Sequence, residues 1–154
     1  MSDTLSNINL EFKIRPATES DFIAVLEILQ SCGLPAKGVK DFFGEAYCVA
    51  ETNTGIVGVG GLETYGDCGL IRSLSVLPMW RWKLIGRNIV INRIARARDL
   101  DLRKVYLFTF DRTDYFDHFG FAEIKRDDLP EEIKNCEEYK SICPSGAFSM
   151  ELTL

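Results

Sequence analysis

The sequence predicts an α/β protein built on a mixed β-sheet with helices on both faces. Residues 19–32 repeat apolar side chains at helical spacing, whereas "GIVGVGGLET" and "LIRSLSVLP" are typical of neighbouring antiparallel strands. A second helix, 85–99, leads into the apolar strand "KVYLFTF". A strand–helix–strand crossover of this length makes its two strands parallel and adjacent, so the sheet is expected to be mixed.

Local signals fix the ends of these elements. Thr18, with Asp21 three residues later, is a helix cap, and Gly33 and Pro35 end the helix that follows. Pro78 stops the strand "LIRSLSVLP". The remaining predicted elements are the first strand "FKIRPAT", a brief helix at 39–43, the strand "AYCVAET", a short helix at 113–119, the strand "GFAEIKR", the helical segment "LPEEIKNCEEY" and the closing strand "AFSMELTL".

Composition limits the function classes. The chain has 154 residues, and we expect a flexible tail at 1–9 followed by one domain at 10–154. The net charge of −5 argues against nucleic-acid binding, and no apolar run is long enough for a membrane span. Five cysteines without a C-x-x-C pair and a single histidine, His118, predict reduced thiols, a cytoplasmic location and no metal. His118 itself is interpreted as a surface residue.

The stretch from strand 74–76 to helix 85–99 is the strongest functional signal. A helix N-terminus offers unpaired N–H groups and partial positive charge, and Arg81, Lys83 and Arg87 add cationic side chains. Neither the G-x-x-x-x-G-K-[ST] pattern nor a G-x-G-x-x-G turn after the first strand is present. The segment therefore predicts a site for a compact polyanion, although a solvated basic helix face is the plainer alternative.

These features resemble the GNAT N-acetyltransferases, whose [RQ]-x-x-G-x-[GA] loop wraps the pyrophosphate of acetyl-CoA. The resemblance extends from "IRPATESDF" to "YFDHFGF". "GLETYGDCGLIRSLSV" and "SICPSGAFSM" are similar to small GNAT proteins of bacterial arsenic-resistance operons, and the C-terminal half resembles, more loosely, the acetyltransferase domain of N-acetylglutamate synthase. The resemblance implies a GNAT fold, acetyl-CoA as cosubstrate, a small amino-acid-like amine as acceptor and a role in arsenic resistance.

Carried over to this chain, the resemblance assigns two groups of residues to CoA. The strand that pairs with pantetheine is Leu74, Ser75 and Val76, and the pyrophosphate loop is Arg81, Trp82, Lys83, Leu84, Ile85, Gly86 and Arg87. Leu84 stands where the family usually has glycine. We expect it to be tolerated if its backbone stays helical and its side chain points away from the pyrophosphate, and otherwise to weaken CoA binding.

Glu63 is the candidate general base, acting through a water, because it ends a strand at the edge of the expected pocket. A strand-end charge in solvent is the alternative, and Asp67 is a weaker competitor. Many family members have a tyrosine that acts as general acid at the position of Phe116 in this chain. The neighbouring Tyr115 is therefore the candidate general acid, and a packed core residue is the alternative. The pocket is expected near Ser75 and Thr109, with Thr109 among the residues that contact the acceptor.

Arg72 alternates with Leu70, Leu74 and Val76, so we expect it to share their face of the sheet. A buried arginine needs a carboxylate partner, and Glu63 would lie diagonally across a hairpin. An internal ion pair is the favoured interpretation, and binding of an acceptor carboxylate is the alternative. The arginines on helix 85–99 are expected to point mostly outward. The oligomeric state is left open, although the apolar final strand could pair across a homodimer. A catalytically silent CoA-sensing module is the rival to the enzyme.

Overall fold

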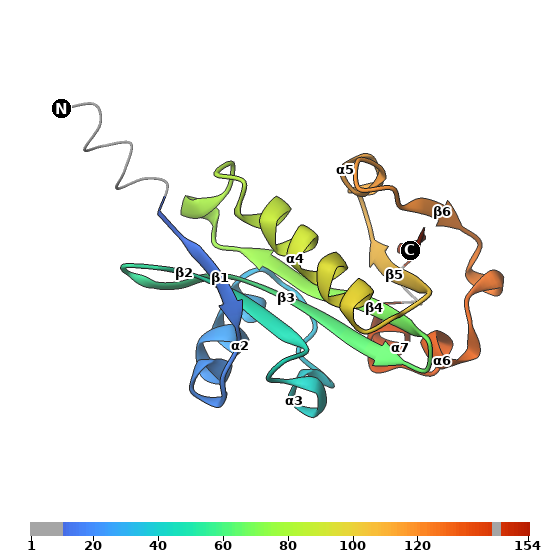
Figure 1. Ribbon diagram of the computed structural model, residues 1–154, viewed down its shortest axis with the longest axis horizontal. Helices are drawn as coiled ribbons and strands as arrows, with labels where there is room; N and C mark the ends of the chain where they lie inside the picture. Colours follow the sequence, from blue (N-terminus) through green and yellow to red (C-terminus); the bar gives the residue numbers. More distant parts are fainter. Residues whose placement is uncertain (1–10, 143–145) are drawn as a thin grey trace.

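A computed structural model describes residues 11–142 and 146–154, so the predicted tail at 1–9 lies outside the described residues (Figure 1). The described chain forms one seven-stranded sheet with the order β1-β2-β3-β4-β5-β7-β6. The strands are β1 (Lys13–Pro16), β2 (Tyr47–Thr52), β3 (Gly55–Tyr65), β4 (Cys68–Val76), β5 (Lys104–Thr109), β6 (Ala122–Ile124) and β7 (Phe148–Thr153).

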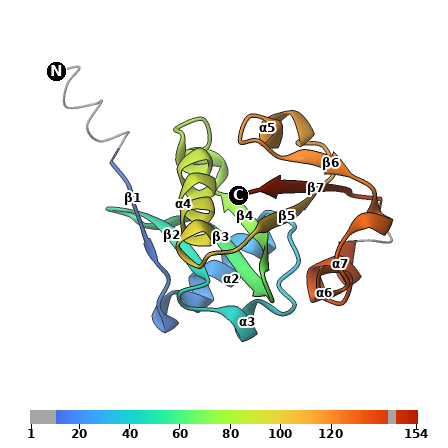
Figure 2. The same cartoon turned by 45° about the vertical axis from the view of Figure 1, so that its right-hand side comes forward.

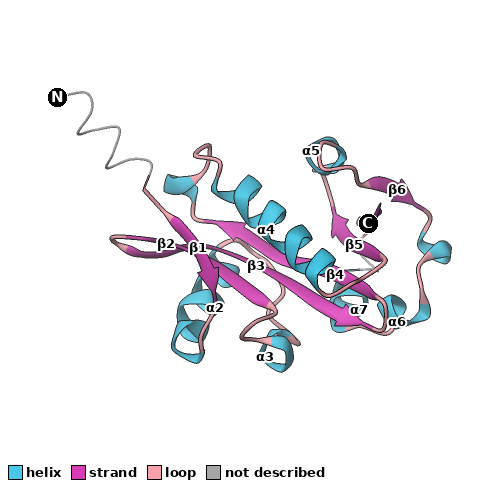
Figure 3. Cartoon of the chain, in the orientation of Figure 1, coloured by secondary structure: helices cyan, strands magenta, loops and turns pink. Residues whose placement is uncertain are grey.

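Helices cover both faces of this sheet. They are α2 (Phe22–Ser31), α3 (Val39–Phe42), α4 (Ile85–Asp99), α5 (Thr113–Asp117), α6 (Glu131–Lys134) and α7 (Glu137–Ile142), with 3-10 turns at Glu19–Asp21, Pro78–Trp80 and Arg126–Asp128. Figures 2 and 3 show α4 and α5 on one side, with α2, α3, α6 and α7 on the other. The predicted capping box at Thr18 is present. The predicted elements are confirmed with small shifts at their ends, except that the single predicted helical segment "LPEEIKNCEEY" is two short helices, α6 and α7.

The central pair of strands, β4 and β5, is parallel as predicted, and every other pair is antiparallel. Their shared ladder is short. It starts at Cys68↔Lys104 and ends at Leu70↔Tyr106, after which β4 runs on to Val76 and β5 to Thr109 without pairing to each other. The sheet therefore splits along its middle, and one edge of β4 is left free of a strand partner.

A β-bulge in β4 changes the predicted face of two residues. The register of β4 against β3 shifts between Gly61↔Arg72 and Val59↔Ser75, and Ser73 has a left-handed φ of 62°. One extra residue reverses the alternation of side chains beyond it. Leu74 and Val76 consequently pack on the α4 side, whereas Arg72 faces α7, so the expectation that they share one face is wrong.

Two details differ from the expectations. The arginines of α4 mostly point outward, as expected, but Arg93 is buried, and its Nη1 donates to the carbonyls of Glu45 and Ala46 at 3.2 and 2.9 Å, which ties α4 to the start of β2. The final strand, β7, is paired with β5 on one edge and, at residues 149–151, with β6 on the other. These three residues are therefore not free to pair with a second copy.

An ion-pair cluster fastens β1 to the first helical turn. Arg15 donates to both carboxylate oxygens of Asp21, at 2.8 and 3.0 Å, and to Glu51 on β2. The neighbouring guanidinium holds the pKa of Asp21 at about 2, below its usual 3.8. The same carboxylate also accepts from the backbone N–H of Thr18, so one side chain completes the cap and the strand contact.

We predict that Asp21→Asn lowers the free energy of unfolding at pH 7 by roughly 1.5–3 kcal/mol, the range for a hydrogen bond to a charged group. Because the folded-state pKa of Asp21 is depressed to about 2, the stability contributed by the ion pair is present above about pH 4 and is lost as the pH falls toward 2. Urea titrations of parent and variant should converge over that interval. A difference that stays constant down to pH 2 would contradict this assignment.

Candidate functional site

The loop before α4 has the backbone of a glycine-rich loop without its glycines. Trp82 and Leu84 both have left-handed φ angles, 68° and 65°, a conformation that glycine adopts freely and that other residues rarely adopt. Alternating left-handed residues turn successive N–H groups toward one side, which is the arrangement of an anion-binding nest. The loop therefore has the shape that a phosphate requires, at a cost in backbone energy.

Of the two conditions under which Leu84 was expected to be tolerated, the structure meets one. Its backbone is left-handed and not helical, since it occupies the N-cap of α4 at ψ 12°. Its side chain is 63% exposed and so points into solvent. At Gly86, an added Cβ would meet the Tyr115 hydroxyl and Val76 only at 3.6 and 3.7 Å. The backbone at the start of α4 is thus open to a ligand.

The free edge of β4 leads directly into this loop. Leu77 donates its N–H to Val57 on β3, so the carbonyl of Val76, one residue earlier, is turned away from β3 and toward the split. That carbonyl accepts from Nε of Arg81 at 2.9 Å. The hydroxyl of Ser75 is buried and has no hydrogen-bond partner. An extended polar chain such as pantetheine can pair with the backbone N–H and C=O groups of a strand edge that has no strand partner. The residues at this edge of β4 therefore fit CoA.

A buried polar cluster lies at the other end of the β3–β4 hairpin. Glu63 is almost fully buried, so the alternative of a solvated strand-end charge is wrong. Its carboxylate accepts from the Tyr65 hydroxyl at 2.6 Å and from Arg72 Nη1 at 3.2 Å, and the Tyr47 hydroxyl lies 3.5 Å away. Burial raises the pKa of both tyrosines, so their hydroxyls remain protonated donors.

Arg72 is the centre of this cluster, and its side chain is only 1% exposed. The predicted diagonal ion pair with Glu63 is confirmed. The guanidinium also donates to the carbonyls of Lys37 and Pro35, at 2.9 and 3.1 Å, and its Nη2 lies 3.0 Å from a carboxylate oxygen of Glu138 on α7. Its Nε is buried without a partner.

The other two predicted site residues lie beyond the split. Tyr115 stacks edge-on against Phe116 and Phe119, and burial raises the pKa of its hydroxyl. Thr109, at the end of β5, is buried and accepts from the backbone N–H of Arg112 at 3.1 Å. Tyr115 packs with the α4 side of the core, whereas Glu63 faces α3 and α7. The split between β4 and β5 is bordered by groups from both faces of the sheet.

Sequence reasoning missed three members of the cluster: Tyr47, Tyr65 and Glu138. The two tyrosines are strand residues of ordinary appearance, and Glu138 lies in an acidic helical segment far along the chain. The spacing of residues along the sequence does not show whether a glutamate such as Glu138 is exposed or buried against Arg72. His118 is exposed, as expected, and among the described residues no group of His, Cys, Asp and Glu side chains gathers as a metal site.

Comparison with known proteins agrees with this architecture. Residues 8–121 match the model of the acetyltransferase (GNAT) family. A solved structure from Mycobacterium tuberculosis, in complex with CoA, is 26% identical with a TM-score of 0.79, covering 92% of this chain and 99% of that one. N-acetylglutamate synthase from Neisseria gonorrhoeae, solved with coenzyme A and N-acetyl-glutamate, is 20% identical with a TM-score of 0.77, covering 94% of this chain and 35% of that one.

A curated relative is the amino-acid acetyltransferase of Mycobacterium tuberculosis, which is 36% identical over 87 residues, or 54% of this chain. The match spans 49% of that relative, about half its length. Because the family model covers most of the chain, from strand β1 through α5, the chain belongs to the acetyltransferase (GNAT) family, and the GNAT fold expected from the sequence is confirmed.

We predict that Leu84→Gly stabilises the protein by about 1 kcal/mol, because glycine adopts the left-handed backbone without the steric cost that leucine bears. The exposed leucine side chain contributes little packing that could be lost. Leu84→Ala is the matched control, since it keeps the Cβ and hence the strain, and should change the stability by less than about 0.5 kcal/mol. Urea unfolding midpoints measure both. Equal midpoints for the glycine and alanine variants would show that the backbone at Leu84 is not strained.

Proposed function

We propose that this protein transfers the acetyl group of acetyl-CoA to the amine of a small amino-acid-like metabolite by direct attack. The observation that carries the proposal is the split between β4 and β5. It lies between a loop shaped for phosphate and a buried cluster that holds a carboxylate and a guanidinium. Membership of the GNAT family and the CoA-bound relatives support the cosubstrate.

In this proposal the free edge of β4 at Leu74, Ser75 and Val76 pairs with pantetheine. The pyrophosphate lies against the backbone of residues 82–86, where the first turn of α4 leaves N–H groups unpaired. Arg81, Lys83 and Arg87 supply positive charge around it. The indole of Trp82, which is 95% exposed, offers a stacking surface for the adenine base.

Glu63 takes the proton from the attacking ammonium, through a water that bridges the two. The nitrogen then forms a bond to the thioester carbon, and the carbon–sulfur bond breaks to release the thiolate. Tyr115 is the candidate donor of a proton to that thiolate, because burial raises the pKa of its hydroxyl and keeps it protonated. Thr109, at the end of β5, lines the acceptor side of the split.

The rival proposal is a GNAT-fold module that binds CoA and regulates a partner without turnover. Two residues favour it: Leu84 in the pyrophosphate loop and Phe116 at the usual position of the acidic tyrosine. The buried network around Glu63 favours the enzyme, because a module that only senses CoA has no use for an internal carboxylate near the split.

Three further assignments remain proposals: a role in arsenic resistance, which rests on the resemblance of "GLETYGDCGLIRSLSV", a cytoplasmic location, and a homodimer built without β7 pairing. None of the helices in residues 11–142 or 146–154 has the length and apolar character needed to cross a membrane.

We predict that Glu63→Gln lowers kcat for acetylation of an amino-acid acceptor by about 10²–10⁴-fold, the usual contribution of a general base. Affinity for acetyl-CoA should stay within about twofold of the parent, because Glu63 lies away from the loop. Asp67→Asn, which alters an exposed carboxylate in the adjoining turn, is the matched control and should keep the parent rate.

The measurement is initial-rate acetylation with a panel of amino acids, alongside calorimetric binding of acetyl-CoA. Parent activity retained by Glu63→Gln would exclude Glu63 as the base. A parent protein that binds acetyl-CoA tightly and acetylates no amine in the panel would favour the regulatory module.

A further inference from the structure

The Arg72 cluster contains one carboxylate more than its guanidinium can neutralise. Arg72 faces Glu63 at 3.2 Å and Glu138 at 3.0 Å, and no second arginine or lysine pairs with these carboxylates among the described residues. Two buried negative charges therefore share one positive charge. Such an arrangement is unfavourable unless every member is fully hydrogen-bonded.

The two carboxylates are not equally well held. Glu63 accepts from Tyr65 and Arg72 with good geometry, whereas the Glu138 oxygen nearest Arg72 is buried and accepts no aligned hydrogen bond. Burial and the charge of Glu63 raise the pKa of Glu138 against the opposing pull of Arg72. Arg72 Nε is also unpaired. Glu138 thus lies 3.0 Å from the guanidinium without an aligned hydrogen bond, and the same guanidinium has an N–H at Nε without a partner.

Glu138 comes from a short helix, whereas the other members of the Arg72 shell come from the sheet and one loop. It lies on α7, a helix of six residues, and its neighbour Glu137 packs against Gly38 and forms an ion pair with Lys37 at 3.5 Å. Glu63 and the two carbonyls, by contrast, belong to β3 and to the loop that leads to α3. Movement of α7 would release Glu138 and leave the rest of the Arg72 shell in place.

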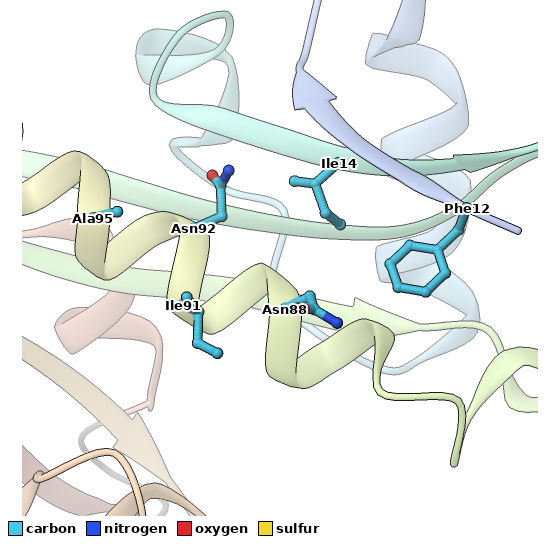
Figure 4. Close-up of a pocket in the computed structure, with 6 residues that line it drawn as sticks. All are labelled: Phe12, Ile14, Asn88, Ile91, Asn92 and Ala95. Carbon is cyan, nitrogen blue, oxygen red and sulfur yellow. The ribbon is translucent and has the colours of Figure 1, made fainter. Parts of the chain in front are cut away.

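Two hollows in the described surface lie away from this cluster. One is a groove between β1 and α4, lined by Phe12, Ile14, Asn88, Ile91, Asn92 and Ala95 (Figure 4). A second lies beside β6 and β7 and includes Arg126 and Phe148. Neither includes Arg72 or Glu63, both of which are almost fully buried. A molecule can reach them only after an element covering them moves.

We propose that Glu138 occupies the subsite for the acceptor's carboxylate on Arg72, and that an α-amino acid enters by displacing it. This inference rests on the proposed acetyl transfer and assigns its acceptor class. An α-amino acid carries its amine and carboxylate on one carbon. With the carboxylate on Arg72 in place of Glu138, the amine lies beside Glu63, whose oxygen is 3.2 Å from the same guanidinium. Because the acceptor must displace Glu138, it needs a negatively charged group that can bind Arg72, and competition with Glu138 lowers its apparent affinity.

Glu138→Gln tests this inference directly. The amide lacks the charge that competes for Arg72, so the open site is populated more often and the KM for amino-acid acceptors falls by about fivefold or more. The kcat should remain within about twofold, since Glu138 does not touch the reacting atoms. The KM for the decarboxylated amine of the same acceptor should not change, because such an amine does not use Arg72.

Glu137→Gln is the matched control, because it alters the neighbouring, partly exposed carboxylate of the same helix, which does not contact Arg72, and should leave every constant unchanged. A merely structural role for Glu138 predicts the reverse pattern: a lower unfolding temperature and an unchanged or higher KM. That outcome, or an equal response of the amino acid and its decarboxylated amine, would overturn the inference while acetylation itself stands.

Direct binding separates this inference from the proposed function. The same amino-acid panel is titrated into the CoA-saturated parent and Glu138→Gln proteins by calorimetry. Tighter binding to the variant supports the displacement of Glu138 even if no acceptor is turned over, in which case acetyl transfer alone has failed. If no amino acid binds either protein, the carboxylate subsite is refuted.

Discussion

The structure depends on the early separation of two parallel strands. β4 and β5 share a ladder only from Cys68↔Lys104 to Leu70↔Tyr106 and then diverge. Backbone groups left unpaired inside a protein are costly, so a split of this kind persists where a ligand or another element can satisfy them. The free edge of β4, the loop before α4 and the polar cluster all border this split. The positions of the site residues follow from it.

Strain is concentrated in the same segment. Ser73, Trp82 and Leu84 all have left-handed backbones although none is glycine. Ser73 produces the bulge that turns Arg72 toward α7 while Leu74 turns toward α4. Trp82 and Leu84 shape the loop. Each such residue costs of order 1–3 kcal/mol and persists when the surroundings fix it. The segment thus gives up local stability for the orientation of its N–H groups and side chains.

Much of the fold could be predicted from the sequence because its signals are local. Helical spacing, Pro78 and the basic loop located the crossover, and the crossover required β4 and β5 to be parallel. The bulge could not be predicted, because "IRSLSV" has no glycine to mark it. Because the bulge was not predicted, Leu74 and Val76 were expected on the wrong face of the sheet. The burial of Arg93 and the contact of Glu138 with Arg72 depend on tertiary packing between distant segments, which periodicity does not record.

The central claim is that the split sheet and the loop at Leu84 hold CoA, and calorimetric titration of the full chain with acetyl-CoA tests it most directly. Dephospho-CoA and pantetheine, titrated in parallel, separate the contributions of the basic loop and of the strand edge. The account predicts micromolar binding of acetyl-CoA, weaker binding of dephospho-CoA, and the weakest binding for pantetheine, which lacks the pyrophosphate. Equal affinity for all three compounds, or no binding of acetyl-CoA, would contradict it.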